Sequence, residues 1–245
     1  MDRHPLLLSV AVACTYGAAS AAWADGSLGG SLDVTSDYIY HGLSQSDRDP
    51  AIQGDIHYRS ESAGATAENF IGLWGSTIGR TVTDGSYELN AYLGRTILID
   101  SDSSATANYV HYAYPDSHGT PHYDYDELSG TWAYQDRLFA TVAWTPNTAR
   151  YSEYSERAEG LCCRFLSYDV AVHQSLGHAF TLSAALGYDE LRGLSGYGYW
   201  NAGIAYALGA FQLEVAYFGL QPREEYVYGD VLAGNRVVAT LVWRF

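Results

Sequence analysis

Apolar and polar residues alternate along most of this chain, in about twelve segments separated by polar or glycine-containing connections. A period of two is the pattern of a β-strand with one apolar face. Alternating segments of roughly ten residues are typical of strands that cross a membrane in a barrel. The predicted outward faces are Leu32, Val34, Tyr38 and Tyr40; Ile52, Ile56 and Tyr58; Ile71 and Leu73, or in the other register Phe70 and Trp74; Tyr87, Leu89, Ala91 and Leu93; Val110, Tyr112 and Tyr114; Leu128, Trp132 and Tyr134; Leu138, Ala140, Val142 and Trp144; Tyr168, Val170 and Val172; Phe180, Leu182, Ala184, Leu186 and Tyr188; Trp200, Ala202, Ile204 and Tyr206; Phe211, Leu213, Val215 and Tyr217; and Val237, Ala239, Leu241, Trp243 and Phe245.

The opposite faces of these segments carry polar, charged or small side chains, which a barrel would turn towards its lumen. The pattern therefore predicts an all-β fold, an antiparallel transmembrane β-barrel of about 12 strands. We expect the lumen to be acidic and to be lined by Asp33, Asp37, Asp55, Arg59, Glu88, Glu127, Asp169, Glu214 and Arg236. Other polar residues predicted on the same faces are Asn90, Thr131, His173, Ser183, Asn201, Gln212 and Arg244.

Connection lengths and aromatic residues separate a membrane barrel from a soluble β-sandwich. Long connections near 41–50, 79–85, 115–123, 145–163, 189–196 and 219–235 alternate with short ones near 100–104, 135–137, 175–178 and 207–210; 60–67 is the one exception. Long outer loops and short inner turns are the rule in outer-membrane barrels. Aromatic residues near the strand ends predict two interfacial girdles. The outer girdle would hold Tyr40, Tyr114, Trp144, Tyr188, Trp200 and Tyr217, and the inner one Tyr58, Tyr134, Phe180, Tyr206, Phe211, Trp243 and Phe245.

The last strand ends on an aromatic residue, with another aromatic two positions earlier. A soluble edge strand would alternate in the same way. A strand that closes an outer-membrane barrel characteristically ends on such a phenylalanine, which the barrel-assembly machinery recognises. We therefore expect Leu241, Trp243 and Phe245 to form the assembly signal.

The first 24 residues have the pattern of a secretory signal peptide. A short n-region, residues 1–5, is followed by the apolar stretch 6–13 and by Ala22-Trp23-Ala24, a small-residue cleavage site. The apolar stretch is far shorter than the roughly 20 residues of a membrane-spanning helix. Lipidation at Cys14 is the remaining alternative. The prediction is a cleaved signal peptide, residues 1–24, followed by one barrel domain, residues 25–245.

Composition agrees with a barrel and excludes several classes. The chain has 22 Tyr and 25 Gly, and no apolar run approaches the roughly 18 residues that a transmembrane helix requires. Three cysteines, one of them in the signal segment, do not make a disulfide scaffold. A net charge of −15 argues against nucleic acid as a partner.

Candidate chemistry is sparse. None of the metalloprotease, Walker or serine-hydrolase motifs is present. His173 and Ser175 have the spacing used by outer-membrane phospholipases, but the alternation turns them inward near a short inner turn, away from lipid. His111, His118 and His122 with Asp116, Asp124 and Asp126 could form a metal site or simply a solvated loop. Cys162 and Cys163 could be a strained disulfide or ordinary thiols. We expect no enzyme activity, no cofactor and no metal.

The segment from Val34 to Tyr58, which contains Tyr40-His41-Gly42 and Asp47-Arg48-Asp49-Pro50, closely resembles the N-terminal hairpin of the TorF-type porin family of proteobacteria. Gly72-Leu-Trp-Gly-Ser76, Tyr112-Ala-Tyr-Pro115 and Asp124-Tyr-Asp-Glu-Leu-Ser-Gly130 resemble further family segments in the same order. The resemblance covers roughly the first half of residues 25–245 and implies an outer-membrane channel without catalysis. The family usually has Phe-Arg-Gly at residues 40–42, so an ion preference is not carried over.

Twelve strands lie between the filled barrels of about eight strands and the open channels of 16–18. The sequence therefore predicts a narrow, acid-lined, cation-preferring channel for ions or small solutes in the outer membrane of a Gram-negative bacterium. Its expected partners are outer-membrane lipid and lipopolysaccharide, the barrel-assembly machinery and small solutes. The alternatives are a non-conducting barrel whose outer loops bind surface or host ligands, and an outer-membrane lipid hydrolase.

Overall fold

The computed structural model describes residues 26–61, 66–117, 123–148, 164–193, 195–221 and 232–245. Residues 1–24, the predicted signal peptide, lie outside these ranges. Among the residues described, no helix is long and apolar enough to cross a membrane.

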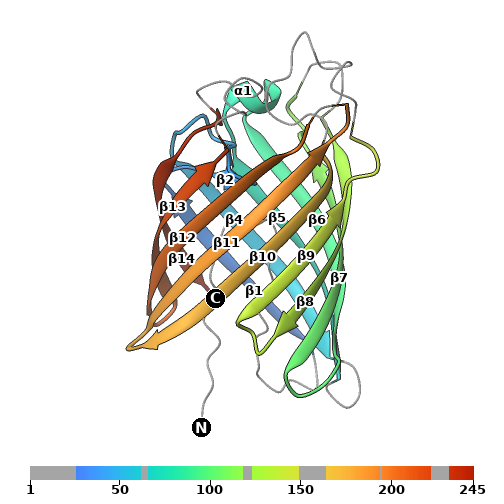
Figure 1. The fold of residues 1–245 in the computed structure, drawn as a ribbon, viewed down its shortest axis with the longest axis vertical. Helices are drawn as coiled ribbons and strands as arrows, with labels where there is room; N and C mark the ends of the chain where they lie inside the picture. The colour runs from blue at the N-terminus through green and yellow to red at the C-terminus, as the bar shows by residue number, and fades with distance from the viewer. Residues whose placement is uncertain (1–25, 62–65, 118–122, 149–163, 194, 222–231) are drawn as a thin grey trace.

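Twelve antiparallel strands form one closed barrel, which confirms the predicted fold class (Figure 1). Each strand pairs with the next one in the wall, and β1 pairs with both β4 and β14. The wall strands are β1 (Ser27–Thr35), β4 (Ala51–Glu61), β5 (Ala67–Thr77), β6 (Tyr87–Leu98), β7 (Ser103–Ala113), β8 (Tyr125–Tyr134), β9 (Leu138–Trp144), β10 (Arg164–Gly177), β11 (Phe180–Leu191), β12 (Tyr197–Leu208), β13 (Phe211–Leu220) and β14 (Arg236–Arg244).

The last residue takes part in barrel closure. The main-chain N–H groups of Gly30 and Phe245 each donate a hydrogen bond to the carbonyl oxygen of the other, at 3.1 Å. Further along the seam, Ser31 pairs with Arg244 and Thr35 with Thr240. Closure leaves neither β1 nor β14 with an unpaired edge, so the backbone polar groups of the wall are satisfied within the sheet.

Long and short connections lie at opposite ends of the barrel, as the sequence predicts. The helix α1 (Arg80–Thr83) lies in one of the long connections, at the end opposite the β10–β11 turn (Figure 1). In that turn His178 and Ala179 both have positive φ, as a two-residue turn between twisted strands requires. We call the end with the long connections the outer end and the other the inner end.

The outward face is apolar over most of the barrel, and ten of the predicted strand faces match it. These include the Ile71–Leu73 register of β5, since Phe70 is buried. Leu186, Leu213 and Val237 are each at least half exposed. Four of the six residues predicted for the outer girdle face outward: Trp144, Tyr188, Trp200 and Tyr217. All seven residues predicted for the inner girdle also face outward: Tyr58, Tyr134, Phe180, Tyr206, Phe211, Trp243 and Phe245.

One predicted face is wrong in part and another is wrong throughout, and both errors include tyrosines at the outer end. On the first strand Leu32 and Val34 do face outward. Tyr38 and Tyr40 are buried, because β1 ends at Thr35 and the chain then turns into the lumen. In β7 the residues Val110 and Tyr112 are buried and face inward, as does Tyr114 just beyond the strand. The outward face of β7 instead carries Ala107, Tyr109 and His111. A strand with apolar side chains on both faces does not reveal by its period alone which face is lipid-facing.

Candidate functional site: the plugged lumen

Residues 37–46 lie inside the outer half of the lumen in contact with the wall strands, and we call this segment the plug. All ten of its residues are buried. It contains a small hairpin of its own, β2 (Ile39–Tyr40) and β3 (Leu43–Ser44), which is paired separately from the wall. The alternation predicted a wall strand that extends to Tyr40 and an outer loop near residues 41–50, and both predictions are wrong for this segment.

The turn of the plug hairpin fits only a particular residue pair. His41 and Gly42 both have positive φ, at 48° and 80°, as a two-residue hairpin turn requires. A Cβ atom on Gly42 would lie 2.7 Å from the Cβ of Tyr199 and 2.6 Å from a methyl group of Leu220. The hairpin tip is therefore pressed against the inner face of β12 and β13, where only glycine can be accommodated.

An ion pair holds the base of the plug to the wall. Arg236 of β14 donates a hydrogen bond to Oδ2 of Asp37 at 2.8 Å. The other oxygen, Oδ1, accepts hydrogen bonds from the hydroxyl groups of Ser44 at 2.6 Å and Ser46 at 3.0 Å. The carboxylate of Asp37 thus joins the start of the plug, its second strand and the wall. Both Asp37 and Arg236 were predicted to line the pore, and both lie in the lumen.

A second anchor lies at the tip of the plug. Nδ1 of His41 lies 2.8 Å from Oδ1 of Asp189 and 2.8 Å from the hydroxyl of Tyr199. Tyr199 donates its own proton to Asp169 at 2.6 Å, and Tyr197 donates to Asp189 at 3.0 Å. All five side chains are buried. This network ties the hairpin tip to three neighbouring wall strands, β10, β11 and β12.

The third anchor is the buried guanidinium of Arg164. It donates to Glu127 at 2.7 Å and to the Tyr125 hydroxyl at 3.2 Å. It also lies over the ring of Tyr40, 4.6 Å from the ring centre, in a cation–π contact. Burial raises the pKa of the Tyr40 hydroxyl well above its usual range, although the Arg164 charge opposes this shift. Tyr40 is therefore a neutral hydrogen-bonding group, 3.1 Å from the hydroxyl of Tyr112.

Glu88 completes the outer half of the lumen. Its carboxylate accepts hydrogen bonds from Asn90 at 2.6 Å and from the hydroxyl of Tyr38 at 3.4 Å. The ring of Tyr38 packs against Trp74 with centroids 5.5 Å apart. The plug is therefore attached to the wall both by apolar packing and by charged groups, around most of the barrel circumference.

The inner half of the lumen has no such insert among the residues described. On its β4 wall, Asp55 binds His57 and the Tyr92 hydroxyl, each at 2.5 Å. Arg59 lies 3.4 Å from Glu68. Many inward polar groups of this half lack a protein partner. Polar atoms without one occur on Asp33, Asn108, Thr181, Ser183, Gln212 and Glu214.

The nine residues predicted to line the pore all have side chains on the inner side of the barrel. The structure divides them into two groups. Five belong to the plug and its anchors: Asp37, Glu88, Glu127, Asp169 and Arg236. Four lie below the plug in the inner half: Asp33, Asp55, Arg59 and Glu214. Sequence reasoning did not identify His41, Arg164, Asp189 or Tyr199. A local signal is the run Ser44-Gln45-Ser46, which interrupts the apolar–polar alternation just after His41-Gly42.

The remaining candidates do not assemble a reactive centre. His173 faces inward, 5.1 Å from the ring of Phe139, as the alternation predicts. His111 faces outward and contacts Asp126 at 2.8 Å. In the described ranges, no group of three or more His, Cys, Asp or Glu side chains could hold a metal ion. His118, His122, Cys162 and Cys163 lie outside the described residues.

Comparison with known proteins gives a family of unestablished function and a clear fold. A family described as "Bacterial protein of unknown function (Gcw_chp)" matches residues 19–244. No relative was found among curated protein sequences.

Solved structures of outer-membrane barrels resemble the chain over most of its length. The KdgM porin in complex with disordered oligogalacturonate is 9% identical, with a TM-score of 0.51 over 88% of this chain and 99% of that chain. Outer membrane phospholipase A from Escherichia coli is 12% identical, with a TM-score of 0.51 over 88% and 95%. The Salmonella typhi outer membrane phospholipase dimer with bound calcium is 12% identical, with a TM-score of 0.51 over 88% and 90%. At these identities the likeness concerns the fold alone: this chain has the fold of outer-membrane β-barrels.

Proposed function

The chain belongs to the Gcw_chp family, and we propose that it is a narrow outer-membrane channel for passive diffusion of ions or small solutes. The observation that carries the proposal is the distribution of polarity across the wall. Ionisable and polar side chains line the lumen from the plug down to Asp33 and Asp55, while the outward face is apolar. A polar interior that continues on the inner side of the plug is what a water-filled path through the barrel requires.

The outward surface supports a location in the outer membrane. The exposed aromatic residues lie at the two ends of the strands, where a lipid bilayer has its interfaces. The partners of this surface would be outer-membrane lipid and lipopolysaccharide. The side chains of Leu241, Trp243 and Phe245 face outward at the inner end, where the barrel-assembly machinery would recognise them. The resemblance of Val34–Tyr58 to the TorF-type porins supports the same function, and this segment contains the plug.

The structure offers no support for a lipid hydrolase. A hydrolase of this fold must present its reactive groups to lipid, and His173 faces the lumen in the inner half of β10. We propose that the protein is not an enzyme. A non-conducting barrel with ligand-binding outer loops is the remaining alternative, and the packed plug is the observation that would favour it.

Conductance in planar lipid bilayers tests the proposal. We expect the purified, folded barrel to give small, discrete current steps, because the plug narrows the outer half of the lumen. Heat-denatured protein from the same preparation serves as the control for leakage. Absence of current from protein that is folded by gel mobility would overturn the channel and favour a loop-binding barrel. Release of fatty acid from phospholipid vesicles would overturn the proposal that the protein is not an enzyme.

Lumen charge leads us to propose a cation preference. Three acids of the outer half, Glu127, Asp37 and Asp189, are paired with Arg164, Arg236 and His41, whereas Asp33 and Glu214 in the inner half share one base, Arg244. A channel lined by excess carboxylates favours cations. We expect reversal potentials across a salt gradient to show this preference, and to show it less at high salt because of screening. An anion-selective current would contradict the assignment of the inner half.

A further inference from the structure

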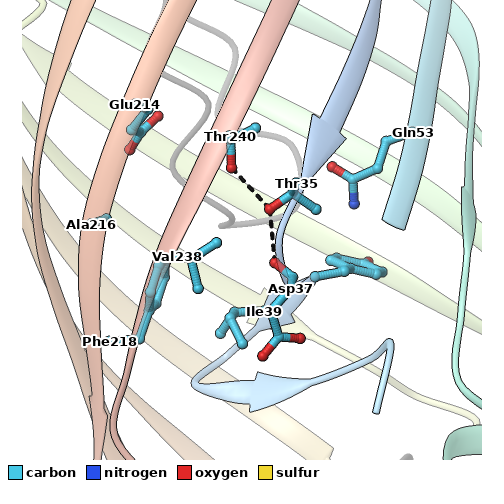
Figure 2. Close-up of a pocket in the computed structure, with 10 residues that line it drawn as sticks. Thr35, Asp37, Ile39, Gln53, Glu214, Ala216, Phe218, Val238 and Thr240 are labelled. Atoms are coloured by element: carbon cyan, nitrogen blue, oxygen red, sulfur yellow. Dashed lines mark hydrogen bonds between the residues drawn. The ribbon is translucent and has the colours of Figure 1, made fainter. Parts of the chain in front are cut away.

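A small, partly open cavity lies against the side of the plug that faces the inner end, between β1, β4, β13 and β14 (Figure 2). Its volume is about 50 Å³, in the measure in which one water molecule needs roughly 10–15 Å³. The plug supplies part of its wall through Ile39, and β13 and β14 supply Ala216, Phe218 and Val238, which pack together. Glu214, Thr240, Thr35 and Gln53 bring polar atoms to the same space (Figure 2).

The hydrogen-bond donors around this cavity point at other partners. Thr240 donates its hydroxyl proton to Thr35 at 2.9 Å, and Thr35 donates to the carbonyl oxygen of Asp37 at 2.8 Å. The side-chain nitrogen of Gln53 donates to Ser76 at 3.3 Å. Both hydroxyl protons and one of the two Gln53 N–H groups are therefore used elsewhere, whereas three oxygens remain as acceptors: the carboxylate of Glu214, the hydroxyl oxygen of Thr240 and the amide oxygen of Gln53.

Glu214 is the group that most needs a partner there. Its side chain is 3% exposed, and its Oε2 atom has no hydrogen-bond partner. The nearest base, Arg244, donates to the amide oxygen of Gln212 at 3.2 Å and is also attracted by Asp33. Two carboxylates thus share one guanidinium. A buried carboxylate oxygen without a partner is costly, so an occupant that supplies positive charge would be stabilised.

We propose that Glu214, Thr240 and Gln53 form a binding site for a small monovalent cation immediately below the plug. A divalent ion is a poorer match, because it prefers several carboxylates or a shell of six to eight oxygens. The inference deepens the proposed function, since it places a specificity-determining residue in the conducting path. The binding site itself does not require that the barrel conduct.

Thermal unfolding of the folded full-length barrel in detergent tests the site without a conductance measurement. The melting temperature is compared in equal concentrations of potassium, sodium and choline chloride, choline being too large for the cavity. At a cation concentration about tenfold above its dissociation constant, we expect a rise of about 3–6 °C over choline. The Glu214→Gln variant should lose this difference, whatever its absolute stability.

Two further variants make the test decisive. Asp136→Asn removes one charge from an exposed inner turn and should retain the full cation-dependent rise. Thr240→Val removes one cavity oxygen without changing the shape of the side chain, and it should reduce the cation-dependent rise in melting temperature. This second variant keeps the proposal testable if Glu214→Gln does not fold. Equal melting temperatures in all three salts would overturn the site, as would an unchanged rise in Glu214→Gln or Thr240→Val.

Conductance separates this inference from the proposed function. In a conducting barrel Glu214→Gln should lower the cation-to-anion permeability ratio by about tenfold, at the low end of what a focused charge contributes. An unchanged ratio would mean that Glu214 does not determine selectivity. A barrel that shows cation-dependent melting but no current would retain the site and overturn the channel.

Discussion

The outer and inner halves of the lumen are built differently, although the same strands run through both. In the outer half the plug is held by Asp37–Arg236, by His41–Asp189 and by the contacts of Tyr40 with Arg164. In the inner half inward polar atoms on Asp33, Ser183 and Glu214 have no protein partner. The outer half also keeps a few such atoms, among them Oε1 of Gln45 and Oδ1 of Asn90. The difference between the halves is therefore the insert, which packs the outer half and has no counterpart among the described residues of the inner half. Because buried polar groups are nearly always hydrogen-bonded, we expect the partnerless atoms of the inner half to bond water.

Of the substitutions proposed here, Arg164→Met should cause the largest loss of stability. The substitution leaves the carboxylate of Glu127 buried without its ion-pair partner, and removes the cation held over Tyr40. Breaking a buried pair in this way costs roughly 3–5 kcal/mol. Urea unfolding of the purified barrel would measure the loss.

The control is the double variant Arg164→Met with Glu127→Gln, which leaves no buried charge behind. It should recover most of the lost stability, because replacing both members of a buried pair is often nearly neutral. A double variant as unstable as the single one would mean that packing of the guanidinium, and not its charge, holds the plug.

A smaller loss of stability is expected from Tyr199→Phe. This change removes one hydroxyl from the network of His41 and Asp169 and leaves both buried partners short of a contact. The expected cost is about 1–3 kcal/mol, measured by the same unfolding assay. Tyr188→Phe is the matched control on the outward face and should change little. Equal effects of the two variants would contradict the network.

The smallest change in stability should come from a substitution in the inner half of the lumen. Ser183→Ala removes a hydroxyl that has no protein partner, so stability should change by less than about 0.5 kcal/mol or rise slightly. Ser44→Ala in the plug is the matched comparison, because its hydroxyl donates to Asp37. It should cost about 1 kcal/mol or more. If Ser183→Ala were the more damaging of the two, the contrast between the halves would fail.

The sequence predicts the wall well and the plug poorly, for a physical reason. Wall strands such as β13 alternate between Leu213, Val215 and Tyr217 outside and Gln212 and Glu214 inside, so the lipid face is unambiguous. Tyrosines at the outer end are ambiguous, because the same side chain suits a membrane interface and a packed lumen. Tyr40 and Tyr114 were assigned to the outer interface for that reason, and both are buried.

The anchors of the plug were missed because they are widely separated in the sequence. His41 meets Asp189 and Tyr199 across 148 and 158 positions. Arg164 directly follows a long connection, where a basic residue would ordinarily be solvated. The lumen-facing acids could be found from period alone, since alternation fixes which face they occupy. Which of them are neutralised depends on the inward turn after Thr35, and no periodic pattern encodes that turn.

The central claim is that the plug, and not the barrel wall, limits passage through the outer half of the lumen. The most direct test is single-channel conductance of the wild type against a variant in which residues 38–45 are replaced by an equal number of alternating glycine and serine residues. Both proteins must first be shown to be folded by gel mobility. We predict that the conductance of the variant is severalfold larger than that of the wild type, because the wall of twelve strands is wide enough to leave a path once the hairpin is gone. Equal conductance in the two folded proteins, or none in either, would contradict the claim.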